Sequence, residues 1–306
     1  MMMFGRRAAS FFVVLLSLVT ALPAQSRPPA ASDSQVSLPP PRTLPMQEGT
    51  TRFAVLGDMG TGGTRQRETA RTMSEVQSRF PFTFVITVGD NIYGGQGVED
   101  MERKFYLPYK PLLDRGVTFH ASLGNHDELG QRFYKLFNMG GERYYTFTRG
   151  PVQFFALDST LMTREQLNWL ELGLERSTSP WKIAYFHHPL YSSGRRHGPQ
   201  IVLRGALEPL LGSYGTQVVF AGHEHFYERL TSQRGIQHFI AGSGGQLRKG
   251  NIRRSSDTAA GFDTDNAFMV VEVNDDDLYF ETISRQGETV DAGVVGRTGG
   301  IRTTTQ

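Results

Sequence analysis

Five short segments of the chain carry side chains that bind metal ions, four of them beside glycine. They are Gly57-Asp58-Met59-Gly60, Gly89-Asp90-Asn91-Ile92-Tyr93, Gly124-Asn125-His126-Asp127, His187-His188-Pro189 and Gly222-His223-Glu224-His225. The donors are carboxylate, amide and imidazole groups, and because the sequence has no cysteine, thiolate ligands and disulfides are excluded. Oxygen and nitrogen donors without sulfur suit Fe, Mn, Zn or Mg. The candidate ligands are too many for one ion, so the set indicates two, which can hold a phosphoryl group and acidify a water.

Each segment alone has an ordinary structural explanation. An Asp-x-Gly sequence commonly forms a turn, Gly-Asn-His-Asp is also typical of a capped loop, and a histidine pair can be one buried ring and its neighbour. The metal hypothesis therefore depends on all five occurring together and in similar positions. No phosphate-binding P-loop and no Gly-x-Ser-x-Gly sequence occurs, so nucleotide-loop and serine-hydrolase chemistry have no support.

Each of the five segments follows an apolar, strand-like run. These runs cover residues 53–56, 82–88, 117–123, 183–186 and 217–221. In an open α/β sheet, ligands bind at the carboxyl ends of the strands, so five loops would bring their side chains to one edge. Glycines beside these positions permit tight turns and close backbone approach.

Helix-like and strand-like patterns alternate through the first part of the chain. Helices are predicted at 65–80, 163–177 and 203–211, with a capping box at Thr163-Arg164-Glu165-Gln166, and a further strand at 153–157. Four more strands, at 226–231, 236–241, 267–273 and 278–283, follow without helices. This order predicts one α/β domain with added antiparallel strands.

The two ends of the chain differ in composition from the middle. Residues 1–24 have the pattern of a signal peptide, with Arg6 and Arg7 before an apolar run that is short for a membrane span of about 20 residues. An uncleaved anchor is the alternative. Residues 25–48 form a Pro-rich linker, 49–290 the folded domain and 291–306 a flexible tail. We expect a secreted or periplasmic protein with no stable membrane anchor after cleavage.

The charge of the chain argues against one class of partner. Lysine and arginine total 32 against 30 acidic residues, a net charge of +2, which lacks the basic excess of nucleic-acid binders. The basic block Arg248-Lys249-Gly250-Asn251-Ile252-Arg253-Arg254 is the exception. It is compatible with a basic lip over an anionic substrate and also with a solvated loop. Nothing in the sequence indicates an oligomeric state.

The five segments resemble those of the calcineurin-like metallophosphoesterases, and most closely the small purple acid phosphatases among them. Tyr93, three residues after Asp90, is the feature that separates this subgroup, and the run from Gly222 to Arg229 is similar to its last motif. The resemblance covers roughly residues 51–285. It implies that residues 49–290 are a catalytic domain with a four-layer α/β/β/α sandwich and mixed sheets.

The resemblance also implies a ligand set and a reaction. Fe³⁺ would be held by Asp58, Tyr93 and His225, and a divalent ion (Fe²⁺, Zn²⁺ or Mn²⁺) by Asn125, His187 and His223, with Asp90 bridging the two. His126 would contact the phosphate or protonate the leaving alcohol, and His197 is a second candidate for such a role. The expected function is an exported acid phosphatase that hydrolyses small phosphomonoesters through a metal-bound hydroxide, with an acidic optimum.

Two other functions remain open from the sequence. A Mn- or Zn-dependent phosphodiesterase of the same superfamily is the nearer one, although Tyr93 argues against it. A non-catalytic secreted phosphate-binding protein is the more remote one. Loss of catalysis normally removes ligands, and all seven inferred ligands are present here.

Overall fold

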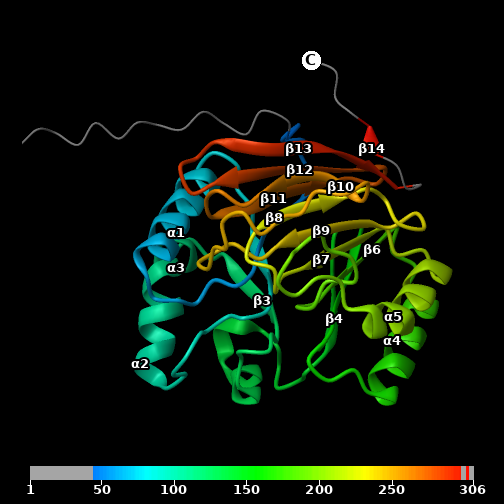
Figure 1. Cartoon of the computed structure of the whole chain (residues 1–306), viewed down its shortest axis with the longest axis horizontal. Helices are drawn as coiled ribbons and strands as arrows, with labels where there is room; N and C mark the ends of the chain where they lie inside the picture. Colours follow the sequence, from blue (N-terminus) through cyan, green and yellow to red (C-terminus); the bar gives the residue numbers. More distant parts are fainter. Residues whose placement is uncertain (1–43, 298–300, 303–306) are drawn as a thin grey trace, which may run out of the picture. The chain divides into compact units, whose positions relative to one another are not determined.

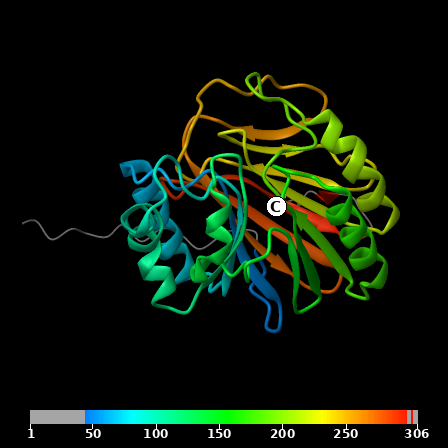
Figure 2. The same cartoon turned by 90° about the horizontal axis from the view of Figure 1, so that it is seen from below.

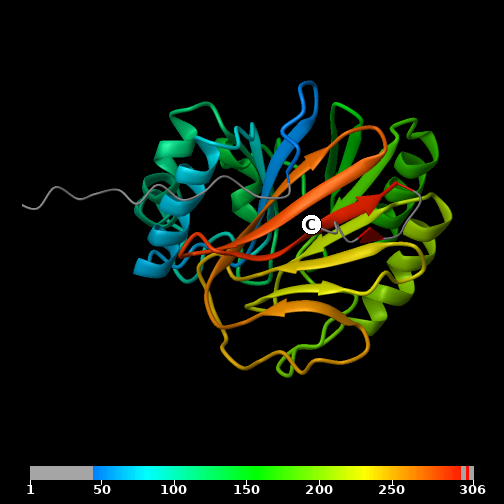
Figure 3. The ribbon, with the colours of Figure 1, turned by 90° about the horizontal axis from the view of Figure 1, so that it is seen from above.

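The computed structural model describes residues 44–297 and 301–302, which form two seven-stranded sheets (Figure 1). The first sheet has the order β14 (Ile301–Arg302), β13 (Thr289–Gly296), β12 (Asp277–Ser284), β11 (Ala267–Val273), β1 (Thr51–Leu56), β2 (Phe84–Val88) and β3 (Thr118–Ser122). Strands β1, β2 and β3 are parallel, and β11 joins β1 in the antiparallel sense. Figure 3 shows β11, β12 and β13, coloured orange to red, crossing beside the blue β1.

The second sheet follows the same plan. Its order is β10 (Thr258–Phe262), β8 (Tyr227–Leu230), β9 (Gln237–Ala241), β7 (Val218–Ala221), β6 (Trp181–Tyr185), β5 (Val152–Ala156) and β4 (Tyr145–Arg149). Strands β5, β6, β7 and β9 are parallel, whereas β4, β8 and β10 are antiparallel to their neighbours. Both sheets are therefore mixed, as the sequence predicted.

The helices cover the outer faces of the sheets. Figure 2 shows α1 (Thr64–Gln77), α2 (Val98–Met101) and α3 (Leu107–Leu113) on one side and α4 (Arg164–Arg176) and α5 (Ile201–Ser213) on the other. Alternate side chains explain the layers, because successive residues of a strand point to opposite faces. Phe53 and Val55 of β1 pack between the sheets, whereas Ala54 and Leu56 pack in the core under the first helices. The four-layer α/β/β/α prediction is confirmed.

Aromatic rings join the two sheets through the central core. Phe53 stacks on Phe84 of the same sheet, with ring centroids 5.3 Å apart, and meets the edges of Phe154 and Phe220 from the other sheet at 5.2 and 6.2 Å. All four rings are buried, and aromatic pairs at these separations add to the stabilisation from burial alone. This core fixes the parallel strands whose carboxyl ends carry the candidate ligands.

Half of the predicted capping box is present. Thr163 Oγ1 accepts a hydrogen bond from Gln166 N at 3.2 Å, so helix α4 begins where the sequence placed it. Gln166 does not reach back to Thr163, however. Its side chain accepts from Asp158 N at 2.8 Å and donates to Asp158 O at 3.0 Å, which ties the helix start to the loop after β5.

The ends of the folded region differ from the predicted boundaries. Strand β13 pairs with β12 and buries Val294 and Val295, so residues 291–296 belong to the sheet and not to a flexible tail. At the other end, Met46 N and Gln47 N donate to the Glu272 carboxylate at 2.8 and 2.7 Å, which attaches the last linker residues. The signal peptide, residues 25–43 of the linker and most of the remaining tail lie outside the described residues.

Four strands were not predicted, namely β4, β10, β13 and the two-residue β14, because their sequences are too short or hide the alternating pattern. Strands β4 and β10 are edge strands that contain no buried residue, and β13 contains Gly293 and Asp291 among its valines. Among the described residues, no helix is both long enough and apolar enough to cross a membrane.

Candidate metal centre

The loops after β1, β2, β3, β6 and β7 bring the seven predicted ligands to one edge of the paired sheets. On one side of this rim, Tyr93 Oη donates to Asp58 Oδ1 at 3.0 Å and lies 3.2 Å from His225 Nε2. His225 Nε2 is 3.4 Å from the same Asp58 oxygen. Three donor atoms from residues far apart in the sequence therefore converge on one point.

The second group of donors surrounds His187. Its Nε2 atom lies 3.0 Å from Asn125 Oδ1, 3.1 Å from His223 Nδ1 and 3.4 Å from Asp90 Oδ1. Its Nδ1 atom donates to the carbonyl of Val88 at 2.9 Å, which leaves only a lone pair on Nε2 of the neutral ring. That lone pair faces the Asn125 carbonyl oxygen, so two acceptors meet without a proton between them. A cation bound by both would relieve this repulsion.

The spacing of these atoms fits metal coordination. Ligands about 2.0–2.2 Å from one ion lie roughly 3.0–3.5 Å from each other in octahedral or tetrahedral geometry, and the separations above fall in this range. Donor atoms of Asp58, Asp90 and His225 lie within 4.8 Å of one another, as do those of His187, His188 and His223. Asp90 links the two groups, because its Oδ1 is also close to His187 Nε2.

The electrostatic environment of the rim also favours bound cations. Asp58 and Asp90 are 0% and 1% exposed, and neither pairs with a lysine or arginine among the described residues. Burial and then the neighbouring Asp90 raise the pKa of Asp58 well above its usual value. Burial and then His187 lower the pKa of His223 to about 2, so its imidazole is neutral. Buried carboxylates next to unprotonated imidazoles are stabilised by bound metal ions.

Unusual backbone conformations place these side chains. Asp58, Asp90 and His223 have φ angles of +54°, +50° and +70°, in the left-handed region that L-residues rarely adopt. Such strain is typical of functional sites held by the surrounding structure. Gly89 has φ +85°, and a Cβ there would lie 2.7 Å from His187 Nδ1. Glycine is therefore required where the loop after β2 passes the imidazole.

The two predicted catalytic histidines lie beside the rim. His126 N donates to Asp90 Oδ1 at 2.9 Å, and its exposed ring lies 4.7 Å from the Tyr93 ring. His197 N donates to Glu224 Oε1 at 3.2 Å, and its ring is 4.2 Å from that of His223. Burial and then the charge of Arg248 lower the pKa of His197. Two imidazoles thus border the candidate centre from different loops.

Three further residues shape the site and were not predicted. His188 places its ring 4.5 Å from that of His223, and its Nδ1 is 2.9 Å from Ser159 Oγ. The half-buried Asp127 accepts through its carboxylate from Gly124 N and from the loop after β2, and desolvation followed by Asp90 raises its pKa to about 7. Glu224 accepts from the loop that carries His197. Each of these three residues is adjacent in the sequence to a predicted site residue, and this adjacency is the feature from which a role at the site could have been predicted.

Comparisons with known proteins point to one family. The family profile described as calcineurin-like phosphoesterase matches residues 51–227, more than half of the chain. Purple acid phosphatase 15 of Arabidopsis thaliana is 30% identical over 71% of this chain, which spans about half (49%) of that protein's length. Tartrate-resistant acid phosphatase type 5 of Rattus norvegicus is 23% identical over 79% of this chain and 89% of its own length.

Solved structures show the same fold at lower identity. A purple acid phosphatase, PPD1, from yellow lupin seeds has a TM-score of 0.68 with 18% identity, covering 86% of this chain and 58% of that one. GAP50, described as the anchor in the inner membrane complex of Plasmodium, has a TM-score of 0.69 with 20% identity over 83% of this chain and 90% of that one. At these identities the likeness concerns the fold alone.

Proposed function

Because this chain belongs to the calcineurin-like phosphoesterase family, we propose that it is an exported dinuclear-metal acid phosphatase that hydrolyses phosphomonoesters. The observation that carries this proposal is the pair of donor groups joined by Asp90. One group is rich in oxygen donors and the other in imidazoles, and both lie at the carboxyl edge of the parallel strands. Relatives named purple and tartrate-resistant acid phosphatase support the choice of reaction.

The proposed ligand assignment follows the two groups. Asp58, Tyr93 and His225 would hold Fe³⁺, and Asn125, His187 and His223 a divalent iron, zinc or manganese ion, with Asp90 shared. Two such ions supply Lewis acidity toward the phosphoryl oxygens and lower the pKa of water. Burial and then the two carboxylates raise the pKa of Tyr93, so its proton leaves only when a strong Lewis acid replaces it. A hard trivalent ion meets this requirement best.

The chain's own residues would bind the substrate and move protons. His126 is anchored through its backbone to Asp90 and has an exposed ring, which suits it to protonate the leaving alcohol or to contact the phosphate. His197 approaches from the loop after β6 and is a second candidate for protonating the leaving alcohol or contacting the phosphate. The Asp127 carboxylate orients the loops that carry Asp90 and Asn125 through its backbone hydrogen bonds.

Two alternatives make different predictions for the same sample. A Mn- or Zn-dependent phosphodiesterase would use the same rim, but Tyr93 and its contacts with Asp58 and His225 favour iron. A non-catalytic phosphate-binding protein would keep the fold without turnover, and one neighbour of this fold is described as an anchor. All seven inferred ligands are retained and converge here, which favours catalysis.

The deciding experiment compares a monoester with a diester. Protein reconstituted with iron and zinc, and separately with manganese, is assayed with p-nitrophenyl phosphate and bis(p-nitrophenyl) phosphate from acidic to alkaline pH. We expect hydrolysis of the monoester by the iron form with an acidic optimum. A preference for the diester in the manganese form supports the phosphodiesterase. No turnover in a metal-replete sample supports the non-catalytic alternative.

Export is the part of the proposal that rests on the N-terminus. The apolar run from Ala8 to Val19 after two arginines supports a cleaved signal peptide and a secreted or periplasmic location. Expression of the full chain with amino-terminal sequencing of the protein recovered outside the cytoplasm tests this. Retention of Met1 on a cytoplasmic product would contradict it.

A further inference from the structure

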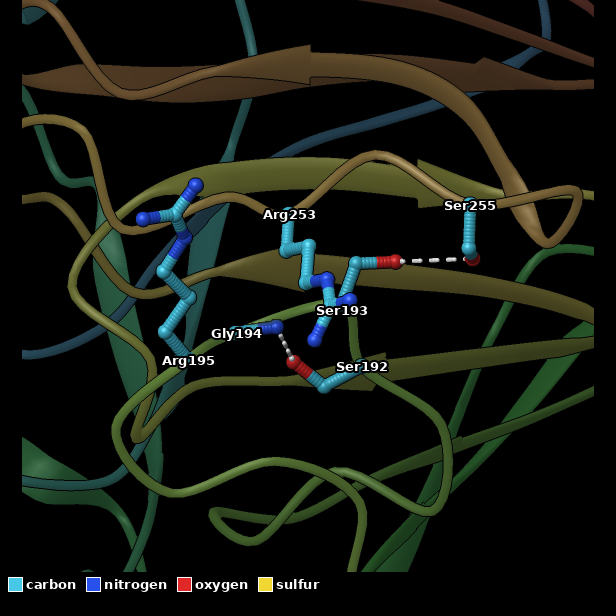
Figure 4. Close-up of a pocket in the computed structure, with 6 residues that line it drawn as sticks. All are labelled: Ser192, Ser193, Gly194, Arg195, Arg253 and Ser255. Carbon is cyan, nitrogen blue, oxygen red and sulfur yellow. Dashed lines mark hydrogen bonds between the residues drawn. The ribbon is translucent and has the colours of Figure 1, made fainter.

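A cavity of about 760 Å³ lies between the loop after β6 and the loop after β9 (Figure 4). It is lined by Ser192, Ser193, Gly194, Arg195, Arg253 and Ser255. Backbone hydrogen bonds from Arg195 N to Asn251 O (3.0 Å) and from Arg253 N to Ser193 O (2.9 Å) join the two loops. Figure 4 shows the two arginine side chains running in opposite directions across the space between the loops. The walls of this cavity are therefore fixed by hydrogen bonds.

Glu224 connects this cavity to the candidate metal centre. It lies between two predicted ligands, His223 and His225, and its Oε1 accepts from His197 N and Gly198 N at 3.2 and 2.7 Å. Its Oε2 accepts from Asn251 Nδ2 at 2.9 Å. One buried carboxylate thus ties both cavity loops to the segment that carries the ligands. Gly194, which lines the cavity, lies directly against this carboxylate, because a Cβ at Gly194 would be 1.9 Å from Glu224 Oε1.

The two loops carry an excess of positive charge. Residues 192–198 and 248–257 contain six basic residues and one acidic residue, Asp257; the basic residues are Arg195, Arg196, Arg248, Lys249, Arg253 and Arg254. None of the six forms an ion pair with any described residue. The carboxylates of Glu228 and Asp263 accept from Ser193 N and Ile252 N, so these two acids hold the loop backbones and form no ion pair with the arginines.

Arg248 belongs to the loop after β9 that also lines the cavity, and it is next to the candidate metal centre. Its backbone N donates to His225 O at 2.9 Å, and after burial its charge is the largest cause of the lowered pKa of both His197 and His225. Its Nη1 atom is buried and has no hydrogen-bond partner among the described residues. A buried guanidinium N–H without an acceptor is costly, and an anionic oxygen would satisfy it.

We propose that this cavity binds a second anionic group of the substrate, so that the enzyme prefers phosphomonoesters that carry a further phosphate. The inference rests on the proposed phosphatase function and adds a substrate class to it. Arginine forks and serine hydroxyls are the donors that recognise phosphate oxygens. Arg195 and Arg253 bind the second phosphate, while Arg248 contacts the anionic region between the two phosphates. A substrate with one phosphate and a neutral alcohol leaves these donors unused.

The test compares two sugar phosphates that differ by one phosphate. kcat/KM is measured on metal-replete protein for fructose 6-phosphate and fructose 1,6-bisphosphate. We expect a preference of about tenfold for the bisphosphate, since two partly exposed charge-assisted contacts contribute modestly each. The double variant Arg195→Ala, Arg253→Ala should lose most of that preference, mainly through KM. Added salt should reduce the preference of the wild type, because exposed charges are screened.

A matched control carries the same kind of charge change elsewhere. Arg176 is exposed at the end of α4, which leads into the start of β6, so it lies at the opposite edge of the sheet from the centre. Arg176→Ala should keep the preference of the wild type. Equal kcat/KM for both substrates in the wild type, or a preference that survives the double variant, would overturn the second-anion site while the phosphatase assignment stands.

A different result would show that the proposed phosphatase function is wrong. If neither sugar phosphate is hydrolysed by metal-replete protein, binding of phosphate and tripolyphosphate is measured by calorimetry on the wild type and the double variant. Tighter binding of tripolyphosphate that is lost in the double variant still supports the cavity as an anion site. Equal binding of tripolyphosphate by both proteins rejects it.

Discussion

The two halves of the candidate metal centre are built from different donors. The aspartate half contains two buried carboxylates and a phenol with one imidazole; its members are Asp58, Asp90, Tyr93 and His225. The histidine half contains three imidazoles and one amide; its members are His187, His188, His223 and Asn125. Anionic oxygens suit a hard trivalent ion, whereas neutral imidazoles suit a borderline divalent ion. This difference between the halves supports the mixed-valence or mixed-metal pair that we propose.

Asp58 of the aspartate half and His187 of the histidine half also respond to protons in opposite directions when no metal is bound. Burial and then Asp90 raise the pKa of Asp58, whereas burial and then His188 lower the pKa of His187. The Asp58 carboxyl therefore favours its neutral, protonated form, and the His187 imidazole favours its neutral, deprotonated form. Both shifts express the same fact, which is that a buried group without a counter-ion avoids its charged form.

The largest effect should come from the residue that belongs to both halves. Asp90→Asn removes the shared carboxylate, and we expect both ions to be bound more weakly and kcat to fall by more than about 100-fold, since even indirect disturbance of ligands costs 10–100-fold. Elemental analysis and phosphatase assays measure this. Asp276→Asn, an exposed aspartate in the turn before β12, is the matched control. Full metal content and near-normal turnover in Asp90→Asn would refute the bridging role.

A substitution in the histidine half should separate the two ions. His223→Asn removes one imidazole and keeps a residue that tolerates the φ of +70° at this position. We expect loss of the divalent ion and a fall in kcat of up to about 100-fold. Iron should be retained, together with the visible absorption band of an Fe³⁺–phenolate pair. Metal content and the visible spectrum decide the outcome. Loss of iron with retention of the divalent ion would reverse the assignment of the halves.

The complementary change lies in the aspartate half. In Tyr93→Phe the phenolate is gone, so a visible phenolate-to-Fe³⁺ charge-transfer band should disappear, while the divalent ion stays and kcat falls by about tenfold. The spectrum of the oxidised protein is compared with that of the wild type. A colourless, iron-loaded wild type would remove the reason for placing Fe³⁺ beside Tyr93 and would favour the phosphodiesterase alternative.

Metal removal should expose the opposite proton responses as a change in stability. The raised pKa of Asp58 means that its stabilising contribution is present below its ordinary pKa of 3.8 and is lost as pH rises through the folded value. The lowered pKa of His223, about 2, means that its contribution is present above 6.5 and is lost as pH falls. At neutral pH the chelated protein therefore carries the aspartate penalty alone.

Thermal unfolding with and without a chelator checks this. We expect chelation to lower Tm at neutral pH by about 4 °C or more. Asp58→Asn should then raise the Tm of the chelated protein and lower that of the metal-loaded protein. A chelated Asp58→Asn variant that is less stable than the chelated wild type at neutral pH would contradict the raised pKa of Asp58.

The sequence predicted those parts of the site that follow directly after a buried strand. Asp58 and Asp90 come at the ends of β1 and β2, where an apolar run stops at glycine, so their place on the rim follows from the strand pattern. Edge strands were harder to predict, because β10 has no buried residue and no alternation of apolar and polar side chains. The strong apolar periodicity of central strands is absent where one face meets water.

The cavity beside the centre could not be predicted in the same way. Its walls come from residues 192–195 and 253–255, which are separated by more than fifty positions and meet only through the backbone pairing of two loops. Serine and arginine are common in the surface loops of any protein, so these residue types alone did not predict a cavity. The basic block at 248–254 is evident in the sequence. Its pairing with the loop that contains residues 192–195 arises only when the chain folds.

The smallest expected effect concerns His188, the member of the histidine half without a role in the predicted ligand set. Ser159 Oγ accepts from His188 N at 3.0 Å and lies 2.9 Å from His188 Nδ1. When the hydroxyl donates its one proton to Nδ1, the neutral ring carries its own proton on Nε2. In that tautomer His188 offers a donor to a phosphate oxygen and no lone pair to a metal ion.

Ser159→Ala tests this distinction. We expect KM for p-nitrophenyl phosphate to rise by about two- to tenfold, the range of one neutral hydrogen bond, with full metal content and an unchanged visible spectrum. Ser78→Ala, an exposed serine just after α1, controls for loss of a hydroxyl. Loss of the divalent ion from Ser159→Ala would instead make His188 a fourth ligand of the histidine half, which would then hold its ion with three imidazoles, two from the loop after β6 and one from the loop after β7.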